Sequence, residues 1–168
     1  MYLFIYTPLK RKSEWNTLIG AIPGALPPIG GWVAATGSIG TGAWILFGIL
    51  FFWQIPHFLS IAWLYRTDYK KGGFKMFMID NKDRFKSNIL LVGFCILTLI
   101  FSLFLIPTPI ASITLISICA TIIMGLWYVI SALKMALKQC VKNARRLLFV
   151  SIIYIPAILV ILVTGNLV

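Results

Sequence analysis

The chain has 168 residues, of which 60% are hydrophobic and 11% charged, and 15 Lys and Arg against 4 Asp and Glu give a net charge of +11. This composition excludes an ordinary soluble domain, in which about a quarter of residues are charged. Nucleic-acid binding is a poor explanation of the positive charge, because no basic helix or stacking platform stands clear of the apolar segments.

Three stretches contain no charged residue: 15–65, 87–133 and 147–168. A bilayer core about 30 Å thick needs about 20 apolar helical residues per crossing. The first two stretches are each long enough for two crossings and the last for one, and turn residues break the double stretches at 36–42 and 106–109. We therefore expect an all-α transmembrane bundle, one membrane-embedded domain over 1–168. Its five spans are predicted at 16–35, 43–64, 88–106, 110–133 and 147–165.

The first residues, Met1 to Tyr6, are apolar. Six helical residues cover only about 9 Å, which is too short for a crossing. We expect them to be the inner end of a sixth helix, and the chain to be the carboxy-terminal part of a larger membrane domain. A short interfacial anchor is the alternative.

A basic loop follows, in which Lys10, Arg11 and Lys12 stand near Ser13 and Asn16. Ammonium and guanidinium groups bind phosphate oxygens well, so one interpretation is a phosphate-binding corner. The other is that these cations only set the orientation in the membrane, and the residues alone leave both open.

The predicted helix 16–35 is rich in proline and glycine. Each internal proline removes a backbone hydrogen bond and tends to kink the helix. In lipid this is tolerated only where neighbouring helices, waters or a cavity satisfy the freed groups. We therefore expect this segment to line the bundle interior and the substrate cavity. The residues concerned are Gly20, Pro23, Gly24, Pro27, Pro28, Gly30 and Gly31.

The next helix, 43–64, carries the single histidine of the chain, His57. On one continuous helix His57 and Asp68 would point roughly the same way, about 16 Å apart along the axis. Trp53 falls near the same stripe, and Gln54 and His57 are polar groups inside a span, which makes them functional candidates. A hydrogen-bonded packing histidine is the alternative.

Asp68 is the acid nearest the end of this helix, and Arg66, Lys70 and Lys71 flank it. Such a face suits a long apolar molecule with an anionic head, although a charge cluster at this place also marks an ordinary membrane boundary. Magnesium prefers oxygen ligands and often binds through one or two carboxylates plus substrate phosphates. Asp68 provides one such ligand, which is half of a site.

All Lys and Arg lie in three segments, 10–12, 66–86 and 134–146. With five crossings these segments fall on one side of the membrane, and the positive-inside rule makes that side cytoplasmic. We therefore expect an integral membrane protein whose basic loops lie in the cytoplasm.

Several motifs are more specific than generic membrane patterns, and they are spread along nearly the whole chain. They are TPLKRK at 7–12 with Asn16, IGAIPGALPP at 19–28 with Gly31-Trp32, WQIPHF at 53–58, YRTDY at 65–69 and NARRL at 143–147. Together they resemble the protohaem IX farnesyltransferases, or haem O synthases.

The resemblance implies a nine-helix intramembrane prenyltransferase, expected in the bacterial cytoplasmic (inner) membrane. Its expected activity is transfer of the farnesyl group of farnesyl diphosphate to a vinyl group of haem B, with Mg²⁺ assisting the departure of diphosphate. Haem A synthase and terminal-oxidase assembly factors are the candidate protein partners.

The resemblance also implies roles for particular residues. Asp68 would ligate Mg²⁺, His57 would contact haem or ligate its iron, and Asn16 lies at the edge of the site. The remaining residues fall into two groups, diphosphate-binding cations and walls of the substrate cavity. The cations are Lys10, Arg11, Arg66, Lys70 and Lys71, and the cavity residues are Trp53, Gln54 and Tyr65.

Two departures from the family pattern bear on activity. The superfamily's first Asn-x-x-x-Asp-x-x-x-Asp motif does not occur in this sequence, and Gly72 stands where the second acidic motif often has an aspartate. We therefore expect the chain alone to be inactive. The alternatives are a quinone-pathway prenyltransferase, or a non-catalytic membrane subunit or inactive fragment.

Overall fold

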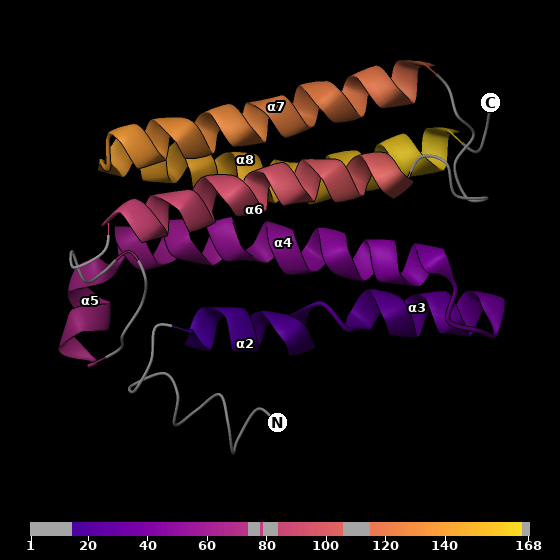
Figure 1. Ribbon diagram of the computed structural model, residues 1–168, viewed down its shortest axis with the longest axis horizontal. Helices are drawn as coiled ribbons and strands as arrows, with labels where there is room; N and C mark the ends of the chain where they lie inside the picture. Colours follow the sequence, from indigo (N-terminus) through magenta and orange to yellow (C-terminus); the bar gives the residue numbers. More distant parts are fainter. Residues whose placement is uncertain (1–14, 74–77, 79–83, 106–114, 166–168) are drawn as a thin grey trace.

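The computed structural model describes residues 15–73, 78, 84–105 and 115–165, with side chains as far as Ile161 in the last helix. In this part of the chain all regular structure is helical (Figure 1). The helices are α2 (Asn16–Gly24), α3 (Pro27–Thr36), α4 (Thr41–Leu64), α5 (Arg66–Lys71), α6 (Arg84–Leu105), α7 (Leu115–Leu137) and α8 (Val141–Gly165).

The long helices run side by side, and successive helices point in opposite directions (Figure 1). The central helix α4 packs against α6 and α8, and α7 packs against both α6 and α8. The 24 residues of α4 form a helix about 36 Å long, which is enough to cross a bilayer core. Counting α2 and α3 together as one span, five helices in the described part of the chain are long and apolar enough to cross a membrane, so the predicted number is confirmed. The expected end of a sixth helix, at 1–6, lies outside the described residues.

Prolines divide the first span into two helices. Pro27 and Pro28 have no N–H, so the carbonyls of Pro23 and Gly24 cannot receive helical hydrogen bonds from them. The helix therefore ends at Gly24 and restarts at Pro27, where a first-turn proline is tolerated.

The prediction that this span lines the bundle interior stays a prediction, because the described residues do not test it. Among them the α2–α3 span packs against α4 at the edge of the layer, while α6 and α8 lie on the other side of α4 (Figure 1). The buried residues of the span are Asn16, Thr17, Ala21 and Ala25.

Three helices extend further than predicted. Helix α6 begins at Arg84 rather than 88, α7 continues to Leu137 rather than 133, and α8 begins at Val141 rather than 147. The added turns carry Lys and Arg, whose long side chains keep their charges in water while the backbone stays helical. Charge therefore marks the edge of the apolar core but does not end the helix.

Close contacts between helices depend on small residues. A Cβ at Gly48 would collide with the Phe101 ring of α6, and a Cβ at Gly125 would collide with Leu99. Between α4 and α6, the ring of Phe52 lies 4.9 Å from that of Phe101. Small residues let helix backbones approach in lipid, where dispersion contacts and hydrogen bonds hold the bundle together.

Candidate functional site

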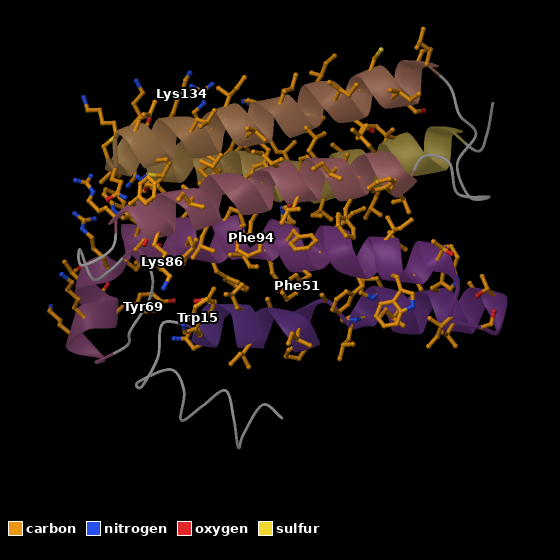
Figure 2. All side chains as sticks on the ribbon, viewed as in Figure 1. Trp15, Phe51, Tyr69, Lys86, Phe94 and Lys134 are labelled. Carbon is orange, nitrogen blue, oxygen red and sulfur yellow. The ribbon has the colours of Figure 1, made fainter. Side chains whose placement is uncertain are left out.

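The ends of the helices divide the molecule into a charged end and an uncharged end. Helices α2, α6 and α8 begin at the end that carries α5, and α4 and α7 finish there (Figure 1). Figure 2 shows Trp15, Tyr69, Lys86 and Lys134 at this end, among many nitrogen-bearing side chains. We call it the charged end. The described turn at the opposite end, 37–40, has no charged residue.

The helix is interrupted at Tyr65, between α4 and α5. The N–H of Tyr65 still donates to the carbonyl of Ile61 at 3.0 Å, but its φ and ψ of −102° and 24° leave the helical region. Helix α5 then turns away from the direction of α4 (Figure 1). The prediction that His57 and Asp68 share one face of a continuous helix is therefore wrong. The basic segment from 66 begins as this short helix, α5.

Helix α5 carries most of the predicted ionic residues. It has no buried residue, and Asp68, Lys70 and Lys71 are all exposed. Within the described chain, the Asp68 carboxylate makes no hydrogen bond or ion pair. The same part of the chain contains no group of three His, Cys, Asp or Glu that could hold a metal. Asp68 could thus serve as one ligand of Mg²⁺, with substrate diphosphate oxygens supplying others.

Arg66 behaves differently from its neighbours. Its guanidinium donates to the carbonyl of Trp63 at 3.1 Å and lies 4.3 Å from the centroid of the Trp63 ring. A cation over an indole face is attracted by the ring quadrupole. Arg66 therefore packs back onto the end of α4, whereas the lysines of α5 extend into solvent.

His57 is a residue of α4 and lies where this helix contacts α8. Its ring stacks on Trp53 with centroids 5.0 Å apart, and its Nδ1 lies 2.8 Å from the hydroxyl oxygen of Ser151. The indole N–H of Trp53 donates to the carbonyl of the same serine at 2.7 Å. We call these three residues the histidine cluster. Two side chains of α4 are thereby held against one residue of α8.

The predicted cavity residue Gln54 points to a different helix. Its amide donates to the carbonyl of Ala21 in α2 at 2.7 Å, and a Cβ on Gly24 would lie 2.5 Å from its Oε1. Gln54 therefore holds α2 against α4 and does not join the histidine cluster.

The other predicted site residues lie at the charged end. Asn16 is buried at the start of α2 and accepts a 3.3 Å hydrogen bond from the Thr17 hydroxyl, whereas Tyr65 is 56% exposed. Lys10 and Arg11 lie outside the described residues.

The structure thus separates the predicted site into two groups. The histidine cluster lies inside the span, with His57 about 10 Å below the end of α4 at Leu64, and the ionic residues of α5 lie at the charged end. Sequence reasoning missed Ser151, because nothing distinguishes it from the other serines of apolar helices. Taken together, the two groups offer an aromatic, imidazole-bearing wall beneath cations and one carboxylate.

Comparisons with known proteins agree on one family. The chain matches the UbiA prenyltransferase family over residues 1–153. It is 41% identical over 161 residues to the protoheme IX farnesyltransferase of Salinibacter ruber, a match that covers 96% of this chain and 56% of that protein. It is 39% identical to the protein of that name from Solibacter usitatus, covering 94% and 53% of the two chains. The chain therefore spans about half the length of these curated relatives. No solved structure matches.

Proposed function

Because the chain belongs to the UbiA prenyltransferase family, we propose that it forms part of an enzyme that transfers the farnesyl group of farnesyl diphosphate to a vinyl group of protohaem IX, converting haem B to haem O. The observation that carries this proposal is its 41% identity to a protoheme IX farnesyltransferase along 96% of the chain.

The charged end suits the diphosphate of such a substrate. Lys70 and Lys71 are exposed on α5 beside Asp68, so their ammonium groups are free to meet diphosphate oxygens. In the proposed site Asp68 holds Mg²⁺ together with those oxygens, and Lys10, Arg11 and Arg66 add further positive charge. When bound, the metal supplies charge stabilisation for the departing diphosphate.

The apolar part of the bundle suits the other groups of the substrates. The farnesyl tail lies along the spans below the charged end, and the porphyrin of haem B lies against Trp53 and His57. Asn16 and Tyr65 line the entrance between the two regions. In this proposal the charged end faces the cytoplasm of a bacterial inner membrane, and the product passes to haem A synthase or to terminal-oxidase assembly.

The test uses a chimera, in which this chain is joined to the part of the Salinibacter ruber relative that it does not match. The purified chimera is incubated with farnesyl diphosphate, haem B and Mg²⁺, and haem products are followed by chromatography and mass spectrometry. We expect formation of haem O. A farnesylated quinone precursor in place of haem O, when both acceptors are supplied, would contradict the proposed acceptor.

Asp68→Asn tests the proposed metal ligand. It removes the carboxylate charge while keeping the size of the side chain. We expect turnover to fall by at least about 100-fold, because loss even of a residue that only supports a metal ligand costs about 10–100-fold. Thr67→Ala, also exposed on α5, is the matched control and should keep full activity. Undiminished turnover in Asp68→Asn would show that the residue is not a ligand.

A further inference from the structure

Ser151 makes hydrogen bonds that constrain the proton on His57. The serine hydroxyl lies 2.6 Å from the carbonyl oxygen of Leu148 in its own helix, and it lies 2.8 Å from Nδ1 of His57. A carbonyl oxygen can only accept, so the single hydroxyl proton of Ser151 is donated to Leu148. The serine oxygen therefore faces the imidazole with its lone pairs and can only accept a hydrogen bond from it.

The neutral imidazole has one N–H donor and one acceptor nitrogen. Because the Ser151 oxygen can only accept on the side of His57, Nδ1 must carry the proton. The ring cannot easily turn to escape this arrangement, since it stacks on Trp53 with an interplanar angle of 22°. The Trp53 indole is itself fixed to the Ser151 carbonyl at 2.7 Å.

The other nitrogen, Nε2, has no hydrogen-bond partner among the described residues. In the same residues no buried side-chain nitrogen or oxygen is left without a partner. Nε2 must therefore reach the surface of the described helices, where it offers an unprotonated lone pair. An imidazole nitrogen with a lone pair is a good ligand for iron and zinc.

We infer that Ser151 is a positioning residue that holds His57 as the Nδ1–H tautomer, so that Nε2 is the atom presented to the metal of a porphyrin. The first half of this inference depends only on the histidine cluster. The second half rests on the proposed function, because it takes an iron porphyrin as the substrate. The established pattern is that a metal-binding histidine donates its other N–H to a fixed acceptor, and Ser151 supplies that acceptor here.

The tautomer can be measured directly, because the chain contains a single histidine. The 168-residue chain is labelled with ¹⁵N-histidine, purified in micelles without a histidine tag, and studied above the pH at which imidazole is protonated. Two-bond ¹H–¹⁵N correlations distinguish the protonated, pyrrole-type nitrogen from the pyridine-type nitrogen. We expect Nδ1 to be pyrrole-type and Nε2 pyridine-type. The reverse assignment would overturn the inference.

Two variants distinguish a role of Ser151 in holding the His57 tautomer from a role in helix packing alone. Ser151→Ala removes the acceptor, and we expect the Nδ1–H tautomer to lose its dominance, with mixed or reversed signals. Ser60→Ala is the matched control, because Ser60 is equally buried and donates at 2.7 Å to the backbone carbonyl of His57 rather than to its ring. The control should keep the wild-type pattern. An unchanged pattern in Ser151→Ala, or the same change in both variants, would contradict a specific role of Ser151.

Zinc protoporphyrin, which is diamagnetic and binds one axial nitrogen, tests the second half. Its addition should shift the Nε2 resonance while the Nδ1 proton stays in place. A shift of Nδ1 with loss of its proton would contradict the inference. No shift at either nitrogen would overturn the porphyrin as the ligand of His57, and the tautomer measured without porphyrin would still decide the role of Ser151. Failure of the proposed function is thus distinguishable from failure of the positioning role.

Discussion

A side chain of α7 fixes the backbone of α4 close to a proline. Pro56 has no N–H, which disturbs the hydrogen bonds of the preceding turn of α4. The Tyr128 hydroxyl of α7 donates to the carbonyl of Trp53, three residues before the proline, at 3.0 Å. The bond from Tyr128 therefore helps to fix Trp53 where its indole meets α8.

The lysines of α5 allow a residue-level test of the proposed diphosphate site. In the active chimera, Lys70→Ala removes one cation from the α5 surface, and we expect the KM for farnesyl diphosphate to rise by about 10-fold, the lower range for a hydrogen bond to a charged group. Steady-state kinetics at fixed haem and Mg²⁺ would measure it.

Lys138→Ala is the control for this variant. Lys138 is also exposed at the charged end, but it lies between α7 and α8 and outside the proposed site. The control should leave KM unchanged. An equal rise in both variants would mean that the charged end attracts the diphosphate only through its overall field, without a defined site on α5.

At the scale of elements, α4 organises the bundle because it contacts three different neighbours. Gln54 reaches α2, Phe52 packs on the aromatic rings of α6, and His57 contacts α8. This explains why α4 is apolar all round, with no polar stripe to mark an outer face. A helix of this kind belongs in the middle of a bundle.

The sequence predicted the spans well and the site less well, for physical reasons. Burying charge in a bilayer is costly, so uncharged stretches give the number of crossings directly. The break at Tyr65 depends on α5 leaving the packed helices, which no local pattern records. The contact between His57 and Ser151 joins residues 94 positions apart, so it follows from the packing of α4 on α8 rather than from any motif.

Glycines at helix crossings give an element-level prediction. A Cβ at Gly125 of α7 would lie 3.0 Å or less from the Cβ, Cγ and Cδ1 atoms of Leu99 in α6, so the side chain cannot simply swing its tip away. We expect Gly125→Ala to lower the free energy of unfolding by about 1–3 kcal/mol, the usual cost of overpacking. Unfolding in SDS, followed by circular dichroism, measures it.

Gly93→Ala is the matched control for that substitution. Gly93 also lies within a spanning helix, α6, but a Cβ there would meet nothing within 4 Å. The free energy of unfolding of Gly93→Ala should stay the same or rise by up to about 1 kcal/mol, because alanine has a better helix propensity than glycine. Equal destabilisation of both variants would show that α6 and α7 do not approach as closely at Gly125 as the structure indicates.

At the scale of the whole molecule, the proposed diphosphate site and the proposed orientation depend on the same residues. The lysines of α5, which would bind the diphosphate, lie at the charged end together with the described cations that would set the membrane topology (Figure 2). A substrate with an anionic head and an apolar tail would therefore enter the bundle from the side on which positive loops are retained. If that side is the cytoplasm, the orientation itself selects the compartment that supplies farnesyl diphosphate.

This orientation can be measured with single cysteines. In a background with Cys95, Cys119 and Cys140 replaced, Ser38→Cys places a thiol in the uncharged turn between α3 and α4, and Lys138→Cys places one at the charged end. A membrane-impermeant maleimide should label Ser38→Cys in spheroplasts and Lys138→Cys in inverted vesicles. The two thiols should be labelled in opposite preparations, because three spans, α4, α6 and α7, separate residue 38 from residue 138 and an odd number of crossings puts them in different compartments. Labelling of Lys138→Cys in spheroplasts would show that the protein has the opposite orientation. The proposed diphosphate site on α5 would then face away from the compartment of its proposed substrate.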